Sequence, residues 1–307
     1  MPKFDGVLFF PVTPFTASGQ VDKEVLVEHL RRGLEAGPGG VFVACGTGEF
    51  HALSPAEYGD AVRTTVETVA GRVPVYAGTG GSLPIAQDFA RIAQEAGADG
   101  LLLLPPYLVG APAAGLAAYV RQVAEASDLP VIVYNRANAR FDAATAAELA
   151  RHDKVVGFKD GVGDLDQLSR VVVAVNDALA GSDKDFQFFN GMPTAEVTVP
   201  AYRGIGVELY SSAVFCFAPE ISNAFYRAVE KGDTALVERF QREFFHPLVA
   251  LRDLVPGYAV ALVKAGVRQR GLDVGGVRAP LVDPAPEHLD ALKRITDAGL
   301  ALVAEIA

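Results

Sequence analysis

The chain has 307 residues, of which 50% are hydrophobic and 21% charged, and a mean hydropathy of +0.24, as expected of a globular protein with a large core. Its net charge of −10 disfavours nucleic acid and anionic membranes as partners, because both bind basic surfaces. Two cysteines and scattered histidines exclude a disulfide scaffold and argue against a metal site. Without a signal-peptide h-region or a membrane-spanning apolar run, we expect a cytoplasmic protein that uses neither metal nor cofactor.

Short apolar runs alternate with amphipathic segments along the first 230 residues. Continuous apolarity, without alternation of period two, indicates parallel strands that are buried on both faces. The eight runs cover residues 6–14, 40–46, 73–79, 100–106, 130–135, 155–161, 186–192 and 206–213. Between them, helices are predicted to begin at capping residues or early prolines, namely Asp22, Ser54-Pro55, Ser82, Asp142 and Asp164. This pattern predicts a (β/α)8 TIM barrel over residues 1–230, with a doubly wound sheet as the alternative.

The strand signal stops after residue 230. Residues 233–253, 257–271 and 286–307 have the composition of three amphipathic helices. We therefore expect residues 231–307 to form a C-terminal helical region that packs on the barrel or on another subunit.

Functional groups of such a barrel lie where its strands end and in the loops that follow. The polar side chains at these places include one lysine and one tyrosine on neighbouring strands, without a cluster of metal ligands or a Ser/His/Asp trio. They are Thr13, Thr47, Glu49, His51, Thr79, Tyr107, Tyr134, Asn135, Arg136, Arg140, Lys159, Asp160, Asn190, Ser211 and Ser212.

The lysine lies in VVGFKDGVGD, residues 155–164. One interpretation is a solvent-facing Lys159 that pairs with Asp160. The other is a desolvated amine that condenses with a ketone, while the phenol of Tyr134 moves the protons. Strand order favours the second, because Lys159 follows the sixth strand and Tyr134 the fifth. Asp160 alternates to the opposite face of the strand and is interpreted as structural.

Two glycine-rich turns and a second lysine have competing interpretations. The amides of GTGE, residues 46–49, suit a carboxylate, although a tight turn with Glu49 as a helix N-terminal charge is an equal alternative. AGTGG, residues 77–81, matches neither common nucleotide-binding motif, which disfavours a nucleotide. Lys264 belongs to the helical region, so we expect it to form a structural ion pair.

Three motifs on these strands resemble the dihydrodipicolinate synthase / N-acetylneuraminate lyase family: GTGE after the second strand, YN closing the fifth and FKD closing the sixth. The resemblance covers the whole chain. It implies a barrel of the class I aldolase type, commonly a homotetramer, that acts on pyruvate or other 2-keto acids. It places the Schiff-base lysine at Lys159, the proton-shuttling tyrosine at Tyr134, and the carboxylate-binding turn at Gly46, Thr47 and Gly48.

Two positions depart from the synthases of this family. Gly46 stands where they carry the first of two threonines, and Leu108 where they carry a second tyrosine, supplied across a subunit contact. A hydroxyl relay through that pair is therefore missing, which argues against a dihydrodipicolinate synthase. The strand-end segments are instead similar to those of 5-dehydro-4-deoxyglucarate dehydratases: CGTGEFHALS, LLPPYL, YNRANARF, GFKDGVGD, FNGMPTAE and YSSAVF.

This closer resemblance implies a lyase that dehydrates and decarboxylates 5-dehydro-4-deoxy-D-glucarate, a keto-deoxy sugar diacid, to 2,5-dioxopentanoate. Such a substrate has a second, distal carboxylate. The candidates to bind it are Arg136, Asn138, Arg140, Asn190, Ser211 and Ser212. The alternatives are a 2-keto-3-deoxy sugar-acid aldolase, a dihydrodipicolinate-synthase-like enzyme, a nicotinamide-dependent oxidoreductase, and a catalytically silent paralogue that binds a sugar acid.

Overall fold

A computed structural model describes residues 4–106 and 108–306, and in these ranges eight parallel strands close into a barrel. Strand order follows the sequence, and the first strand pairs with both the second and the eighth, so the sheet has no edge. The (β/α)8 TIM barrel is thereby confirmed over the doubly wound sheet. The strands are β1 Leu8–Phe9, β2 Gly40–Val43, β3 Val75–Thr79, β4 Gly100–Leu103, β5 Val131–Asn135, β6 Val155–Asp160, β7 Gln187–Asn190 and β8 Leu209–Ser212.

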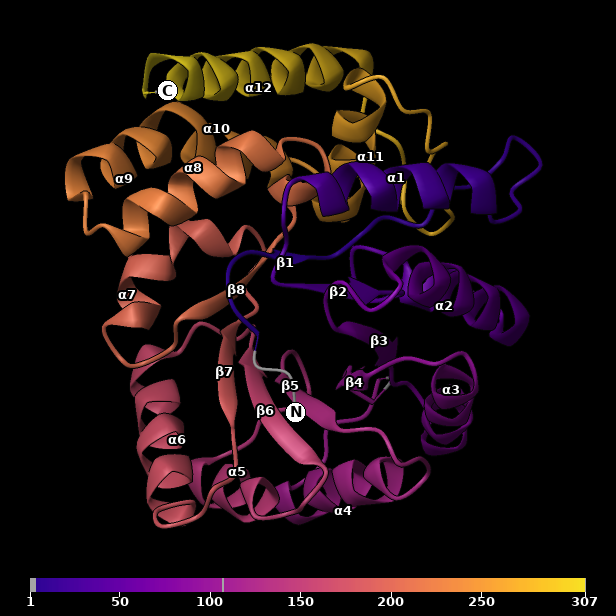
Figure 1. Cartoon of the computed structure of the whole chain (residues 1–307), viewed down its shortest axis with the longest axis vertical. Helices are drawn as coiled ribbons and strands as arrows, with labels where there is room; N and C mark the ends of the chain where they lie inside the picture. Colours follow the sequence, from indigo (N-terminus) through magenta and orange to yellow (C-terminus); the bar gives the residue numbers. More distant parts are fainter. Residues whose placement is uncertain (1–3, 107, 307) are drawn as a thin grey trace.

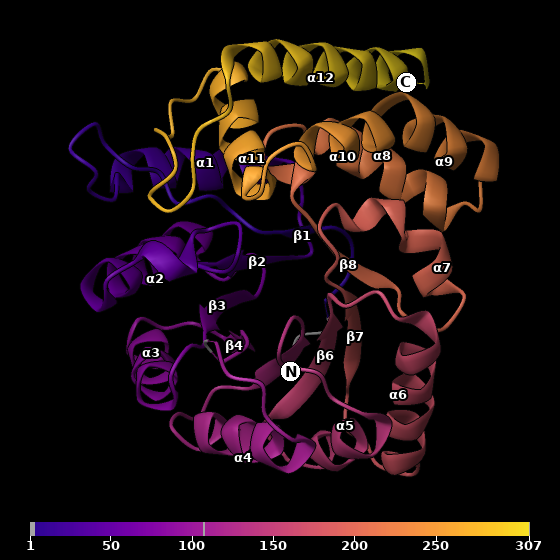
Figure 2. The same ribbon diagram turned by 180° about the vertical axis from the view of Figure 1, so that it is seen from behind.

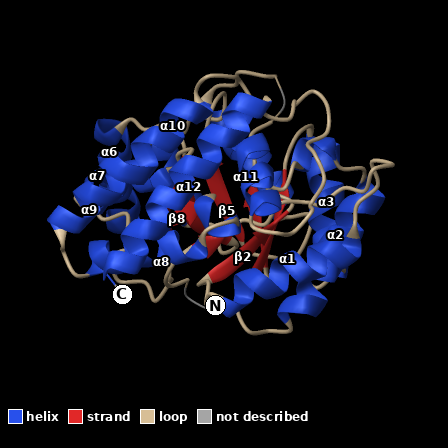
Figure 3. Ribbon diagram, turned by 90° about the horizontal axis from the view of Figure 1, so that it is seen from above, coloured by secondary structure: helices blue, strands red, loops and turns tan. Residues whose placement is uncertain are grey.

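Helices lie around the ring of strands (Figure 1), and in the view from above they flank the strands on both sides (Figure 3). Asp22, Ser54, Asp142 and Asp164 cap their helices by accepting a backbone amide, as predicted, whereas Ser82 occupies the N-cap position without a side-chain hydrogen bond. The barrel helices are α1 Lys23–Glu35, α2 Pro55–Val69, α3 Leu83–Glu95, α4 Ala113–Ala124, α5 Ala143–Ala150, α6 Leu165–Ala178, α7 Val199–Arg203 and α8 Pro219–Glu230.

Aromatic rings fill the barrel interior away from the polar strand ends. Phe4, which precedes β1, lies with its ring centroid 5.2 Å from Phe42, 4.9 Å from Tyr76 and 5.7 Å from Phe189. These rings exclude water from the end of the barrel opposite the loops that follow the strands. β1 is shorter than the predicted run because Pro11 has no amide to donate to a neighbouring strand.

The C-terminal helices confirm the predicted helical segments: α9 Thr234–Phe240, α10 His246–Arg252, α11 Tyr258–Gln269 and α12 Pro286–Ile306. A π-helical turn, Gln241–Phe245, joins α9 to α10 directly before Pro247, which cannot donate an intrahelical hydrogen bond. α12 packs along α8, α10 and α11 (Figures 1 and 2). The division into units at residue 230, where α8 ends, stays a prediction. Of the helices described, none combines the length and apolarity that a membrane span needs.

Candidate active site

Lys159 lies at the end of β6 with its side chain inside the barrel, and it is only 5% exposed. Its Nζ is 4.0 Å from the ring centroid of Phe10 and 4.8 Å from that of Tyr134. Within the described ranges, Nζ has no hydrogen-bond or ion-pair partner. Burial therefore lowers the pKa of Lys159 from 10.5 to about 7, so that much of the amine is uncharged and nucleophilic at neutral pH.

Lys264, the second buried lysine among the described residues, differs from Lys159 because its amine is paired. Lys264 on α11 is fully buried, but its Nζ donates to Glu49 Oε1 at 2.8 Å and to the Gly276 carbonyl at 2.6 Å. Glu49 also accepts the Arg278 amide at 2.8 Å, so its carboxylate is held on both oxygens. The predicted ion pair of Lys264 is confirmed, and Glu49 of the GTGE turn is its partner. One lysine is thus structural, and the unpaired one is free for chemistry.

Tyr134 is beside Lys159, because β5 and β6 pair these two residues in register. Its hydroxyl donates to the Gly191 carbonyl at 2.7 Å and accepts from Arg136 Nη1 at 2.9 Å. A Cβ on Gly191 would lie 2.5 Å from Lys159 Cε and 2.8 Å from Tyr134 Cε2. The glycine after β7 is therefore required for the lysine and tyrosine to pack together.

The GTGE turn follows β2 and faces this pair across the barrel. Thr13 Oγ1, at the end of the first strand segment, donates to the Gly48 carbonyl at 2.7 Å and holds the turn in place. A Cβ on Gly48 would come within 3.0 Å of Ala44 Cα, so the tight turn needs glycine there. Gly46 and Thr47 line the cavity, and neither amide donates to an acceptor among the described residues. Two free N–H groups are suited to a carboxylate.

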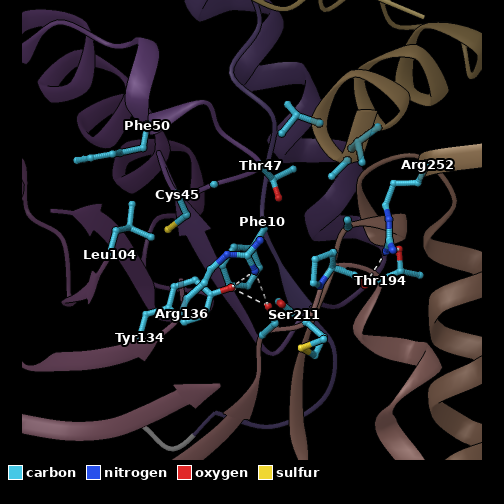
Figure 4. A pocket seen from close by; sticks show the side chains of 18 of the residues that line it. Phe10, Cys45, Thr47, Phe50, Leu104, Tyr134, Arg136, Thr194, Ser211 and Arg252 are labelled. Atoms are coloured by element: carbon cyan, nitrogen blue, oxygen red, sulfur yellow. Dashed lines mark hydrogen bonds between the residues drawn. The ribbon is translucent and has the colours of Figure 1, made fainter. Parts of the chain in front are cut away.

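A cavity of about 500 Å³ opens above Lys159. Thr47, Arg136 and Arg252 point toward it from different sides (Figure 4). The lysine and the two arginines are its charged side chains, and no carboxylate lines it in the part of the chain that the structure describes. Although the molecule carries a net charge of −10, the charged side chains of this largely apolar cavity are cationic, which favours an anionic ligand.

Strand alternation decides which of the predicted β7 and β8 residues reach the cavity. Asn190 pairs with Asp160, and both point outward: Asp160 accepts from Asn135 and Tyr202, and Asn190 donates to Ala195 and Thr198. Ser211 faces inward and lines the cavity, whereas Ser212 faces outward and donates to Glu196 Oε1 at 2.5 Å. The interpretation of Asp160 as structural fits these contacts, and Asn190 and Ser212 are not brought into the cavity.

The loop after β5 separates its two arginines. Arg136 lines the cavity, but Arg140 is exposed and donates to the Ala137 carbonyl at 3.1 Å. Asn138 is also directed elsewhere and donates to the carbonyls of Pro106 and Val109. His51 lines the cavity rim, and Tyr107 lies outside the described residues.

A model of the dihydrodipicolinate synthetase family matches residues 3–298. The chain belongs to this family. It is 56% identical over 300 residues to the probable 5-dehydro-4-deoxyglucarate dehydratase 1 of Streptomyces coelicolor, covering 98% of this chain and 94% of that protein. The probable 5-dehydro-4-deoxyglucarate dehydratase of Bacillus licheniformis is 41% identical over 298 residues, which cover 97% of this chain and 94% of that protein.

Solved structures of the family agree with the fold. Dihydrodipicolinate synthase from Oceanobacillus iheyensis superposes with a TM-score of 0.88 at 27% identity, covering 97% of both chains. YagE from E. coli K12, a family member solved in complex with pyruvate, superposes with a TM-score of 0.85 at 26% identity, covering 97% of this chain and 99% of its own.

Within the family framework, the structure adds residues that sequence reasoning missed. Arg252, at the end of α10, donates through Nη1 to the Pro193 carbonyl at 2.8 Å and to Thr194 Oγ1 at 3.0 Å, and it lines the cavity (Figure 4). The strand-end rule could not find it, because it lies in the C-terminal helical region. Gly191 was overlooked because glycine carries no chemistry of its own, although its place directly after Asn190 was a usable signal.

Proposed function

We propose that this protein is a Schiff-base-forming lyase that converts 5-dehydro-4-deoxy-D-glucarate to 2,5-dioxopentanoate, CO2 and water. The observation that carries the proposal is the unpaired amine of Lys159 beneath a cavity whose charged walls are all cationic. A keto diacid supplies both a ketone for the amine and two carboxylates for the walls. Relatives that are 41–56% identical over nearly the whole chain carry the corresponding name.

In the first half of the reaction, the Lys159 amine attacks the ketone, and the carbinolamine loses water to form an iminium ion. The neighbouring carboxylate accepts from the amides of Gly46 and Thr47. The Tyr134 phenol passes protons to and from the carbinolamine, for which it is positioned beside Lys159. The iminium then acidifies the adjacent methylene, and loss of one of its protons gives an enamine.

In the second half, the enamine expels the β-hydroxyl as water, which leaves an iminium conjugated with a carbon–carbon double bond. This conjugated system accepts the electron pair of the bond to the distal carboxylate, which leaves as CO2. A proton then adds to the enamine carbon and restores the iminium, and the enol becomes the aldehyde when its hydroxyl proton is lost and a proton adds to the neighbouring carbon. Hydrolysis of the iminium consumes one water, which offsets the water lost when the iminium formed, and frees Lys159, so the water from the β-hydroxyl is the one released overall.

We place the distal carboxylate at the wall formed by Arg252 and Thr194, with Ser211 on the neighbouring strand. Arg252 Nε donates to Asp253 Oδ1 at 2.8 Å and Nη1 to Pro193 and Thr194, which leaves Nη2 for a charge-assisted hydrogen bond to a carboxylate. Arg252 Nη2 has no partner among the described residues and is available for this contact. The homotetrameric assembly stays a prediction from the family resemblance, and the cytoplasmic location stays a prediction from the sequence.

The test combines borohydride trapping with product analysis. Incubation with 5-dehydro-4-deoxy-D-glucarate is expected to release CO2 and 2,5-dioxopentanoate, and borohydride is expected to leave a reduced adduct on Lys159, located by peptide mass spectrometry. Lys159→Met should abolish the adduct and lower turnover by more than about 10⁴-fold, as removal of a covalent nucleophile does.

Lys154→Met is the matched control, because Lys154 lies just before β6 at the opposite end of the barrel and donates to the carbonyls of Ala124 and Ser127. This variant should keep both adduct and turnover. Pyruvate as the product would favour the sugar-acid aldolase instead. Absence of any adduct in the unmodified protein would favour the silent sugar-acid-binding paralogue.

A further inference from the structure

We propose that Arg136 is a positioning residue that holds and electrostatically primes the Tyr134 phenol for proton transfer, in place of the hydroxyl relay that this chain lacks. The inference rests on the proposed Schiff-base function and assigns a residue to its proton transfers. It departs from the sequence-based expectation, which grouped Arg136 with the candidates for the distal carboxylate.

The two positions that carry the hydroxyls of this relay in the synthases, 46 and 108, have no hydroxyl in this chain. Gly46 has no side chain, and an added Cβ would meet nothing within 4 Å, so that place is open space. Leu108 is apolar, and its side chain is 81% exposed. A phenol that exchanges protons in a buried site needs a donor that fixes its oxygen and stabilises charge on it. The structure supplies that donor from a different element.

Arg136 makes this contact through a defined geometry. Its Nη1 donates to Tyr134 Oη at 2.9 Å and to the Gly191 carbonyl at 3.4 Å, and the phenol itself donates to the same carbonyl at 2.7 Å. A Cβ on Gly161 would lie 2.9 Å from Tyr134 Oη and 3.1 Å from Arg136 Nη1. The three polar groups are therefore packed closely together, and the glycines are what leave room for them.

Backbone geometry aims the arginine at the tyrosine. Residues two apart along a strand share a face, so Arg136 continues the inward face of Tyr134 just beyond β5. The chain then turns back at once: Arg136 and Ala139 exchange backbone hydrogen bonds of 3.0 and 2.9 Å, with Ala137 at φ +51°. This small turn holds the Arg136 backbone where its side chain reaches the phenol.

The positive charge of Arg136 stabilises the phenolate form of Tyr134. Burial raises the pKa of Tyr134, because a phenolate in this site would lose its hydration, and the Arg136 cation opposes that rise. Arginine keeps its own proton under these conditions, so it is not a member of the proton chain. Its effect must act through Tyr134, which makes the inference testable by coupling.

The test is a double-mutant cycle with Arg136→Met and Tyr134→Phe, read out as the rate of borohydride trapping with pyruvate at pH 9. At that pH an amine with a pKa of about 7 is largely unprotonated, so a changed charge near Lys159 does not dominate the rate. Tyr134→Phe should slow trapping by about 10²-fold. Arg136→Met should slow it by about 10- to 100-fold alone, but by less than about 2-fold when Tyr134 is already Phe.

Three further measurements separate this role from others. Arg136→Lys, which keeps a cation and a donor, should restore part of the trapping rate and serves as the second variant if Arg136→Met folds poorly. Arg151→Met, at the C-cap of α5 on the opposite end of the barrel, should trap as the unmodified protein does. In turnover of the sugar diacid, Arg136→Met should lower kcat more than it raises KM.

Equal slowing by Arg136→Met in both tyrosine backgrounds, or a rise in KM for the diacid with unchanged trapping of pyruvate, would overturn the proposal. The failure of the proposed function is a separate result: the protein would trap pyruvate, yet release no CO2 from the sugar diacid. The cycle with pyruvate would still measure the coupling of Arg136 to Tyr134 in that case. If the unmodified protein traps no keto acid, both proposals fail together.

Discussion

Two lysines are buried among the residues that the structure describes, and of these two Lys264 alone is paired. Lys264 meets Glu49 at 2.8 Å, whereas Lys159 is surrounded by the rings of Phe10 and Tyr134. An unpaired ammonium ion in such surroundings has lost its hydration without compensation, so the uncharged amine becomes accessible near neutral pH. Both lysines are buried, so it is the presence or absence of an ion-pair partner that distinguishes the structural Lys264 from the nucleophile Lys159.

This difference predicts the pH dependence of imine formation. Burial lowers the pKa of Lys159 from 10.5 to about 7, so the trapping rate with pyruvate should rise with pH around a midpoint near 7 and level off by about pH 8.5. Borohydride trapping at a series of pH values measures the midpoint. A rate that keeps rising beyond pH 9.5 would show that Lys159 retains its ordinary pKa.

At the scale of elements, an acidic side chain is enclosed between β8 and the π-helical turn. Glu196 is fully buried: Ser212 donates to its Oε1, and Gln241 Nε2, from the π-helical turn, donates to its backbone carbonyl at 2.8 Å. Its Oε2 has no partner among the described residues. Burial raises the pKa of Glu196 from 4.5 to about 7, which favours the protonated acid in the folded state.

The raised pKa predicts a stability effect of defined sign. Between pH 4.5 and about 7 the folded state keeps a proton on Glu196 that the unfolded state has released, so this group makes the free energy of unfolding fall as pH rises through that window. Glu196→Gln should remove this contribution. The free energy of unfolding of the variant, relative to that of the unmodified protein, should therefore be higher at pH 8 than at pH 5. Urea unfolding at the two pH values measures the difference.

Glu208→Gln is the control for this comparison, because Glu208 is exposed on the connection just before β8. It should leave the pH dependence of unfolding unchanged. If Glu196→Gln also leaves it unchanged, Glu196 is ionised in the folded state at neutral pH, contrary to the prediction.

At the scale of the whole molecule, the C-terminal helices contribute residues to the candidate active site as well as packing on the barrel. α11 contributes Lys264, which holds the GTGE turn through Glu49, and α10 contributes Arg252 to the cavity wall. Arg278, in the segment between α11 and α12, donates to both Glu49 and Glu57. The turn proposed for the proximal carboxylate and the wall proposed for the distal one are therefore both supported from residues 231–307.

This arrangement predicts that Arg252 affects binding of the diacid and leaves the imine chemistry intact. Arg252→Met should raise KM for the sugar diacid by about 10- to 100-fold, because it removes charge-assisted hydrogen bonds to the distal carboxylate. Trapping of pyruvate, which has no distal carboxylate, should stay unchanged.

Arg242→Met, an exposed arginine of the π-helical turn with 66% of its side chain accessible, is the matched control and should alter neither measurement. An equal loss for pyruvate and for the diacid would instead assign Arg252 to holding Pro193 and Thr194 in place.

The sequence by itself determined the barrel, the helical C-terminal region and the two residues at the centre of the site. Continuous apolar runs identify strands buried on both faces, and strand order alone brings Lys159 and Tyr134 to adjacent strand ends. The structural role of Lys264 also followed from its position in the chain, and the interpretation of Asp160 as structural fits its contacts with Asn135 and Tyr202.

Tertiary structure decided what depends on register and on contacts between distant segments. A shift of one residue along a strand exchanges its two faces, so sequence could not tell that Ser211 faces the cavity while Asn190 and Ser212 face the helices. Arg252 reaches the site only because α10 packs near the loop after β7. Whether a buried lysine is paired is likewise a property of packing, and that pairing separates Lys159 from Lys264.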